Sequence, residues 1–355
     1  MTVSLCMIVR DEEAVLGRCL DSVVGLFDEI IVTDTGSRDA TVRIAAGHGA
    51  RVHHFTWCDD FAAARNASFS HATSDFLFWM DADDVLTEEN RCGFLTLKNS
   101  LTPETDVVLM PYETAFDEDG KATFTFLRER LIRRALPHRW VGYVHEVLCY
   151  EGRETVSGVA VTHKSIKTAY SDRNLKLYEL HMARGDPFTP RDIFYWGREQ
   201  YYHGRDREAT ETLTAFLHHP GGWVENKIDA CRLLATMAVR AGDTGAALAA
   251  YAQTFRYGTP RAEVCTDIGQ LLADRGEWDG AIFWFRAALD APMPDDSRGF
   301  RDTTRARFDP LLGLCMCYDR LGEREQALHY HRMAAALRPK APAVLYNQKY
   351  FDAQS

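Results

Sequence analysis

The stretch "DFLFWMDADDVL", residues 75–86, joins an apolar run to a cluster of acidic residues. The run from Phe76 to Met80 is typical of a strand that is buried on both faces. Three aspartates follow within the next four residues. Carboxylates so close together repel one another, so a buried strand ends in them only where a partner offsets their charge. The surrounding sequence indicates what that partner is.

Strand-like runs alternate with helical patterns up to residue 168. This alternation predicts a mainly parallel sheet that helices cover on both faces. A helix near Glu88–Ser100, a strand over 106–112 and a hairpin turn at "DEDGK" (117–121) then break the pattern. We therefore expect a mixed sheet in an α/β domain over residues 1–168. The strand-like runs before the break are "VSLCMIV" (3–9), "EIIVTDT" (29–35), "RVHHFTW" (51–57) and "DFLFWM" (75–80).

One phrase recurs in the second half of the chain, where no strand pattern is found. Each copy begins with a glycine and has an alanine five residues later. A closing proline follows, and the whole matches the tetratricopeptide pattern of paired helices. We therefore expect an all-α domain of tetratricopeptide-like helical repeats over residues 169–355. The copies are "GRDREATETL" from Gly204, "GDTGAALAAY" from Gly242, "GEWDGAIFWF" from Gly276 and "GEREQALHYH" from Gly322.

Composition and charge exclude several classes of function. The net charge of −10 argues against nucleic-acid binding, which requires a basic face. Nine scattered cysteines predict free, mostly buried thiols in a reducing compartment. The start of the chain does not resemble a signal peptide, and no apolar run is long enough for a membrane span. We expect a soluble, cytoplasmic protein with no nucleic-acid partner and no membrane span.

The aspartates stand where ligands bind in such a sheet, at the carboxyl end of a strand. Asp81 and Asp83 are two apart, so on an extended segment they point the same way. Mg²⁺ commonly takes one or two carboxylates together with phosphate oxygens, so a metal with a diphosphate would offset the repulsion. The alternative is a solvated loop in which an aspartate caps the helix near Thr87, a role that Asp84 also fits.

Asp34 places a second carboxylate at the end of a strand, where it can accept hydrogen bonds from a base or ribose. No GxGxxG motif follows the first strand, which argues against a dinucleotide-binding version of this architecture. The two acidic edges favour a nucleotide diphosphate that is held through a metal.

Four motifs in the first domain resemble a family 2 glycosyltransferase of the GT-A fold. They are "SLCMIVRDEEAVLGRCLDSV" (4–23), "DEIIVTDTGSRDAT" (28–41), "FTWCDDFAAARNAS" (55–68) and "DFLFWMDADD" (75–84). The third motif, a later "WVGYVHE" (140–146) and the helical-repeat tail resemble the bacterial group that includes the sublancin-type peptide S-glycosyltransferases.

The resemblance implies a UDP-sugar donor, such as UDP-glucose or a UDP-N-acetylhexosamine, and Mn²⁺ or Mg²⁺. Asp83 is then the principal metal ligand, with Asp81, and His163 is a third ligand. The alternative for His163 is a surface residue at a strand end. The implied donor-binding residues are Val9, Arg10 and Glu12 beside the nucleobase, Asp34 at the uracil or ribose, Asp81 and Ala82 at the ribose or diphosphate, and Arg65 and Asn66 in the donor pocket.

The alternative for Arg65 is an ion pair with Asp59 or Asp60.

Inverting sugar transfer also needs a general base that takes the proton of the acceptor. The segment "RWVGYVHEVLCY" (139–150) is the richest candidate, with Glu146 as the base and His145 supporting it or contacting phosphate. The alternative is that Glu146 is an exposed charge on a strand and His145 is structural.

The helical repeats point to the acceptor, because solenoids of helix pairs commonly bind extended peptides in a concave groove. We expect transfer to a Ser/Thr or Cys side chain of a peptide or protein. The repeats could instead buttress the first domain or form the interface of a homodimer. A cell-surface saccharide or a lipid-linked acceptor is another alternative, and so is a non-catalytic scaffold in which only the repeats work.

Overall fold

The computed structural model describes residues 1–166, 170–292 and 299–353. Contacts divide the chain into two units. The first comprises Met1–Thr114 and Phe126–Pro187, and the second comprises Ala115–Thr125 and Phe188–Ser355. Helix α5 (Arg173–Arg184) thus belongs to the first unit, although the sequence assigns it to the repeats. The predicted boundary between residues 168 and 169 lies outside the described residues.

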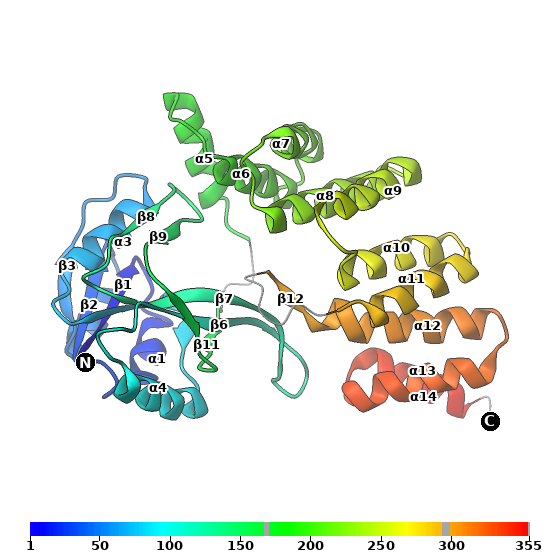
Figure 1. Cartoon of the computed structure of the whole chain (residues 1–355), viewed down its shortest axis with the longest axis horizontal. Coiled ribbons are helices and arrows are strands. Elements are labelled where there is room, and N and C mark those ends of the chain that lie inside the picture. Colours follow the sequence, from blue (N-terminus) through cyan, green and yellow to red (C-terminus); the bar gives the residue numbers. More distant parts are fainter. Residues whose placement is uncertain (167–169, 293–298, 354–355) are drawn as a thin grey trace. The chain divides into compact units, whose positions relative to one another are not determined.

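The main sheet has the strand order β3-β2-β1-β4-β7-β6-β11-β5. Figure 1 labels β1, β2, β3, β6, β7 and β11 of this sheet. Strand β1 pairs in parallel with β2 and β4, and β2 pairs in parallel with β3, whereas β7 runs antiparallel to β4. The expected mixed, mainly parallel sheet is therefore confirmed. The strands are β1 Val3–Val9, β2 Glu29–Asp34, β3 Arg51–His54, β4 Phe76–Trp79, β5 Asp84–Val85, β6 Val107–Phe116, β7 Ala122–Arg133, β10 Glu154–Val156, which pairs with β6, and β11 Val161–His163.

Two layers cover this sheet, because side chains alternate along each strand. Leu5 and Met7 of β1 belong to one core cluster and Cys6 belongs to the other. The first cluster packs under α1, α2 and α4, and the second under α3 and a separate two-stranded sheet. The bounds are α1 Leu16–Asp21, α2 Thr41–Gly47, α3 Phe61–Ser70, α4 Glu88–Ser100, β8 His138–Val141 and β9 Val147–Tyr150.

Helix α4 lies where the sequence predicts it, and the hydroxyl of Thr87 caps its N-terminus. The side chain of Thr87 accepts a hydrogen bond from the backbone N–H of Asn90. This is the usual work of an N-cap residue. The alternative in which an aspartate of the acidic cluster caps this helix is therefore wrong.

The second unit contains the four predicted helix pairs, α6·α7, α8·α9, α10·α11 and α12·α13. The four repeat glycines have φ between 71° and 78°, a left-handed conformation that suits glycine. The four alanines that follow them are fully buried between helices. The helices are α6 Pro190–Tyr202, α7 Asp206–His218, α8 Val224–Arg240, α9 Thr244–Gln253, α10 Ala262–Asp274, α11 Trp278–Asp290, α12 Asp309–Arg320, α13 Arg324–Leu337 and α14 Pro342–Asp352; two short turns, Thr254–Tyr257 and Thr304–Phe308, and strand β12 (Arg301–Asp302) complete the unit.

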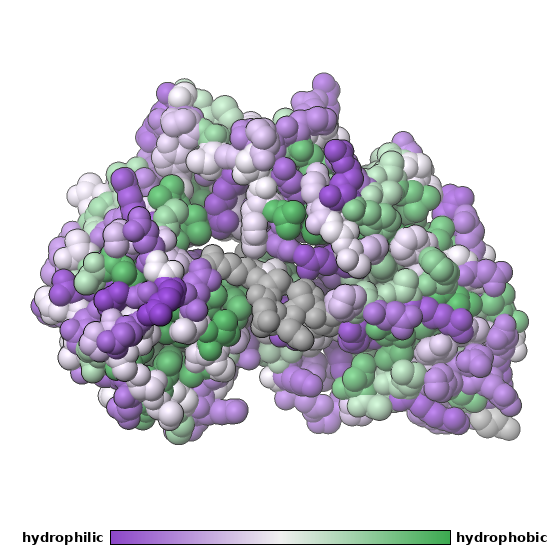
Figure 2. All heavy atoms as spheres, in the orientation of Figure 1, coloured by the Kyte–Doolittle hydropathy of each residue, from purple (hydrophilic) through white to green (hydrophobic). Residues whose placement is uncertain are grey.

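The distribution of surface residues and the state of the cysteines are those expected from the amino-acid composition. Figure 2 shows hydrophilic and hydrophobic residues mixed over the visible face of each unit. Within the described ranges, no helix combines the length and the apolar character that crossing a membrane requires. All nine cysteines are free thiols and six are buried, as predicted.

Candidate active site

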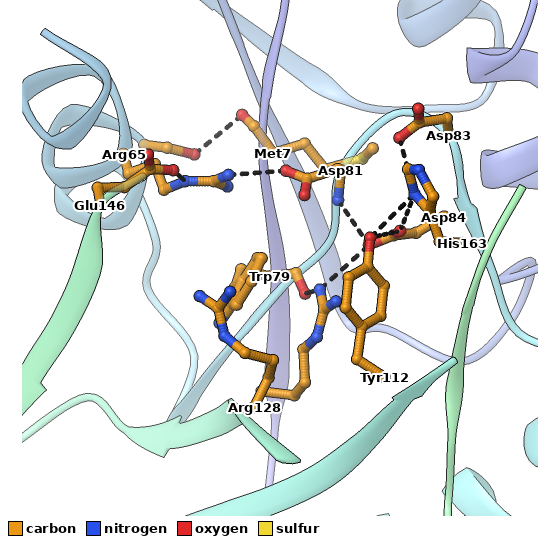
Figure 3. Close-up of polar contacts among 12 residues, drawn as sticks. Met7, Arg65, Trp79, Asp81, Asp83, Asp84, Tyr112, Arg128, Glu146 and His163 are labelled. Atoms are coloured by element: carbon orange, nitrogen blue, oxygen red, sulfur yellow. Dashed lines mark hydrogen bonds and ion pairs between the residues drawn. The ribbon is translucent and has the colours of Figure 1, made fainter. Parts of the chain in front are cut away.

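The chain turns immediately after β4. The backbone N–H of Asp84 donates to the carbonyl of Asp81 at 3.1 Å, which closes a turn across residues 81–84. Because this segment is not extended, Asp81 and Asp83 do not point the same way, and the expectation that they converge is wrong. Figure 3 shows Asp81 directed toward Arg65 and Asp83 directed toward His163.

Arg65 of α3 joins two carboxylates that lie far apart in the sequence. Its Nη2 donates to Oδ1 of Asp81 at 2.7 Å, and its Nε donates to Oε1 of Glu146 at 2.5 Å. The guanidinium carbon lies 4.9 Å from the ring centroids of both Trp79 and Trp140. Arg65 thus offsets the charge of Asp81, one of the three aspartates after β4.

The aspartates that precede α3 have partners other than Arg65. Asp60 caps α3 by accepting from the N–H of Ala63, and Asp59 pairs with Arg184 at 3.0 Å. The alternative in which Arg65 pairs with Asp59 or Asp60 is therefore wrong. The amide of Asn66 donates to the carbonyl of Trp140 and accepts from its N–H, both at 2.9 Å, so it fastens α3 to β8. Its role in donor binding stays a prediction.

Burial alone would raise the pKa of Asp81 and of Glu146. The positive charge and the hydrogen bond of Arg65 outweigh burial at Glu146, and at Asp81 they do so together with the charges of Arg130 and Arg128. The pKa of Asp81 falls to about 2, and that of Glu146 is lowered from its ordinary value. Both groups are therefore carboxylates at neutral pH, as a proton acceptor has to be.

The lowered pKa of Asp81 predicts a loss of stability in acid. A carboxylate with a depressed folded-state pKa stabilises the fold above its ordinary pKa of 3.8, and this contribution disappears as the pH falls toward about 2. We expect the unfolding free energy of the wild-type protein to fall more steeply below pH 4 than that of Asp81→Asn. Denaturant unfolding of both proteins at a series of pH values measures the difference. Parallel curves would contradict the prediction.

Asp84 is fully buried, and a second arginine offsets its charge. Its Oδ2 lies 3.1 Å from Nη1 of Arg130, which is equally buried, and its Oδ1 accepts from the hydroxyl of Tyr112 at 2.7 Å. The backbone N–H of Asp81 also donates to Asp84 at 3.1 Å. A helix cap is therefore the wrong role for Asp84, which is part of a buried network beneath the turn.

Asp83, Asp84 and His163 form the one group among the described residues in which metal-ligating atoms gather, all within 4.8 Å of one another. Nδ1 of His163 lies 3.5 Å from Asp83, 3.4 Å from Asp84 and 2.9 Å from the hydroxyl of Tyr112. The hydrogen bond to Asp84 raises the pKa of His163 against the opposing effect of burial. Carboxylate and imidazole donors fit Mn²⁺. Of the predicted ligands, Asp83 and His163 come together, whereas Asp81 pairs with Arg65.

Glu146 lies in the loop between β8 and β9, and its side chain is only 10% exposed. The alternative of an exposed strand charge is therefore wrong. Helix α5 and the start of α3 hold this loop: the hydroxyl of Tyr178 donates to the carbonyl of Val144, and the N–H of Phe61 donates to that of Tyr143. The rings of Tyr143 and His181 stack at 3.8 Å.

His145 has a φ of 52°, in the left-handed region, and its ring faces Tyr178 with the centroids 6.5 Å apart. A non-glycine residue in this conformation persists only where its surroundings hold it. His145 is thus turned toward α5, and the surrounding residues have to hold its backbone in this conformation.

Residues 4–144 match the model of glycosyl transferase family 2. This part of the chain is a family 2 glycosyltransferase domain. With the mixed sheet, the match confirms the GT-A fold that the sequence predicts. The matched range includes Asp34, Arg65 and the three aspartates after β4, whereas Glu146 and His163 follow it.

Two curated relatives extend the similarity beyond the family 2 domain. The chain is 31% identical over 299 residues to a TPR repeat-containing protein of Synechococcus elongatus, covering 82% of this chain and 66% of that protein. It is 28% identical over 251 residues to the SPbeta prophage-derived glycosyltransferase SunS of Bacillus subtilis, covering 66% of this chain and 58% of that protein. The chain thus spans less than two thirds of the length of these relatives.

Among solved structures, S. aureus TarS (residues 1–349) in complex with UDP-GlcNAc is 14% identical, with a TM-score of 0.40, and covers 72% of this chain and 92% of that one.

Four of the predicted donor residues, Val9, Arg10, Glu12 and Asp34, lie at or just after the carboxyl ends of β1 and β2. Val9 pairs with Asp34 in register. The carboxylate of Asp34 accepts from the N–H groups of Gly36 and Ser37 and lies 3.4 Å from Nδ1 of His54. Next to Val9, Arg10 is exposed, and the N–H of Glu12 donates to Thr41. Ala82 is buried in the turn after β4.

Sequence reasoning missed two arginines of the family 2 domain. Arg128 and Arg130 stand two apart on β7, so they face the same side of the sheet. Their guanidinium carbons lie 4.8 and 3.9 Å from the centroid of Trp79. The local signal was the alternation of two arginines along one strand, whereas the pairing of β7 with β4, which buries Arg130, is known from the structure.

Proposed function

We propose that the protein transfers a hexose, with inversion, from a UDP-sugar to a Ser/Thr or Cys side chain of a peptide or protein. One observation carries the proposal. In a family 2 domain, Asp81 lies between the group Asp83–Asp84–His163 and the pair Arg65–Glu146 (Figure 3). In this proposal, the place of the metal-bound diphosphate is next to the buried carboxylate of Glu146.

Asp83 and His163 would hold Mn²⁺ or Mg²⁺, with Asp84 completing the set. The bound ion supplies positive charge to the departing diphosphate. The buried contacts of Asp84 to Arg130 and Tyr112 keep the ligand atoms in place. UDP-glucose and the UDP-N-acetylhexosamines are the donors to test first.

Glu146 has the position and the charge for a general base. Its Oε1 accepts from Arg65, so the other carboxylate oxygen can take the proton of the acceptor hydroxyl or thiol. As that proton leaves, the acceptor oxygen or sulfur bonds to the anomeric carbon. The bond from this carbon to the diphosphate oxygen breaks, and its electron pair leaves with UDP. Attack opposite the leaving group inverts the anomeric centre.

The second unit supports a polypeptide acceptor. Stacked helix pairs of this kind commonly bind extended peptides. The sequence also resembles the group that includes peptide S-glycosyltransferases, and one curated relative is named for glycosyl transfer and another for its repeats. A second copy of the chain bound through the repeats is the competing use of this unit.

Release of UDP from a panel of nucleotide sugars, with Mn²⁺ and with EDTA, tests the proposal. We expect metal-dependent release from one donor, which also identifies the sugar. No release from any donor, together with no thermal shift on adding UDP and Mn²⁺, would contradict the proposal and favour a non-catalytic scaffold.

Substituting Glu146→Gln removes the base and preserves the size of the side chain. Transfer should fall about 100- to 10,000-fold, the usual contribution of general base catalysis, while UDP with Mn²⁺ still binds. Kinetics and calorimetric titration check the two parts of this prediction. Glu151→Gln, in an exposed position nearby, is the control and should transfer normally. Normal transfer by Glu146→Gln would show that another group is the base.

A further inference from the structure

We infer that Arg65 is a positioning residue, which sets the place of Glu146 relative to Asp81 and does not bind the donor diphosphate. The inference rests on the proposed function, since it takes Glu146 as the base. It departs from what the family resemblance implies for Arg65, namely contact with the donor.

Two of the five N–H donors of Arg65, one on Nε and one on Nη2, are committed to carboxylates. Nε donates to Glu146 and Nη2 donates to Asp81, so different edges of one planar group hold the two acids. The width of the guanidinium therefore sets the separation of the carboxylates. One of them belongs to the turn after β4, and the other belongs to the β8–β9 loop.

The rings of Trp79 and Trp140 pack against the guanidinium of Arg65 and restrict its movement. Trp79 and Trp140 are 2% and 1% exposed, and their rings meet edge to face with the centroids 5.1 Å apart. Arg65 lies equally close to both and is itself only 8% exposed. Cation–π contacts in a desolvated site such as this are stronger than those at the surface.

A diphosphate could take over the Nε and Nη2 donors of Arg65 only at a high cost. Turning the guanidinium away would leave Glu146, whose side chain is 10% exposed, without its positive partner. An uncompensated buried carboxylate is strongly unfavourable. Asp81 would lose the same partner, close to Asp83 and Asp84. The stable arrangement is the one in which Arg65 stays hydrogen-bonded to both carboxylates, keeps them ionised and fixes their positions relative to each other.

A lysine cannot replace Arg65 in this arrangement. An ammonium group is a point charge on a flexible stem, and it lacks the planar fork that addresses two acids at once. Arg65→Lys therefore keeps the positive charge in the site and loses the geometry. This variant separates a positioning role from a simple requirement for charge.

The test uses the full chain with Arg65→Lys and, as a matched control, Arg139→Lys on the exposed face of β8. Turnover of the donor with water as acceptor gives kcat and KM, and titration calorimetry with Mn²⁺ gives the affinity for UDP. We expect kcat of Arg65→Lys to fall about 100-fold, the scale of a misplaced catalytic group, with little change in UDP affinity. The control should match the wild-type protein in both measurements.

A double variant tests whether Arg65 acts through Glu146. If Arg65 acts through Glu146, then Arg65→Lys should cost almost nothing further in a Glu146→Gln background. A second loss of about 100-fold in that background would overturn the inference, because it would show that the two residues act independently.

The outcomes also separate this inference from the proposed function. UDP binding weakened about tenfold or more in Arg65→Lys would assign the residue to the donor and overturn the inference alone. An unchanged kcat would overturn it as well. No UDP release from any donor by the wild-type protein would overturn the proposed function, and the inference with it.

Discussion

Replacing Asp83 by alanine is expected to reduce UDP release in the presence of Mn²⁺ by about 100- to 1,000-fold, the usual effect of removing one group that stabilises a departing charge. Asp83 is the ligand candidate whose charge neither Arg65 nor Arg130 directly offsets, so its loss affects the metal site most. The fold should persist, because a partly exposed pair such as Asp83–His163 contributes at most about 1 kcal/mol. Kinetics and thermal unfolding measure the two effects.

The control for Asp83→Ala is Glu89→Ala, which removes one negative charge from the exposed start of α4. This variant should keep wild-type kinetics. The thermal shift caused by UDP with Mn²⁺ should disappear in Asp83→Ala and persist in the control. Full activity of Asp83→Ala in EDTA would contradict a metal role for this residue.

Replacing Arg130 by methionine should have the largest effect on stability. Arg130 and Asp84 are both fully buried, so the substitution removes the buried cation of Asp84 and leaves only the partly exposed His163 beside this carboxylate. Breaking a buried pair in this way costs about 3–5 kcal/mol. For a unit of this size, such a loss lowers the unfolding temperature by roughly 10 °C. Calorimetry of the full chain measures the shift.

A compensating change distinguishes the lost charge from lost packing. Adding Asp84→Asn to Arg130→Met removes the unpaired charge, and the hydroxyl of Tyr112 can still donate to the side-chain oxygen. The double variant should regain part of the lost stability. Lys98→Met, which removes the cation of the partly exposed pair with Asp28, is the control and should cost about 1 kcal/mol or less. A double variant as unstable as Arg130→Met would contradict this account.

Local signals in the sequence predict most of the fold. Helix α4 lies where the sequence predicts a helix, and the side chain of Thr87 caps its start. The repeat glycines mark turns that need a left-handed backbone, and the buried alanines mark helix crossings. The parallel half of the sheet follows from continuous apolar runs such as Phe76–Trp79. Each of these signals acts within a few residues of the element that it predicts.

The polar partners in the site could not be predicted in the same way. Glu146 is 81 residues from Arg65 in the sequence, and Arg130 is 46 residues from Asp84. Such pairs depend on how the sheet and its layers come together, which no local pattern encodes. The prediction that the side chains of Asp81 and Asp83 point the same way was wrong for a different reason. It assumed an extended segment, whereas a backbone hydrogen bond from Asp84 to Asp81 closes a turn there.

The attachment of helix α5 to the loop of Glu146 affects how truncations should be designed. A fragment that stops at residue 168 would keep every acidic residue discussed above and would still lack Tyr178 and His181, which brace that loop. Loss of turnover in such a fragment would therefore say nothing about whether the repeats take part in catalysis. A fragment that ends after Pro187, where the first unit ends, removes the repeats and leaves the brace in place.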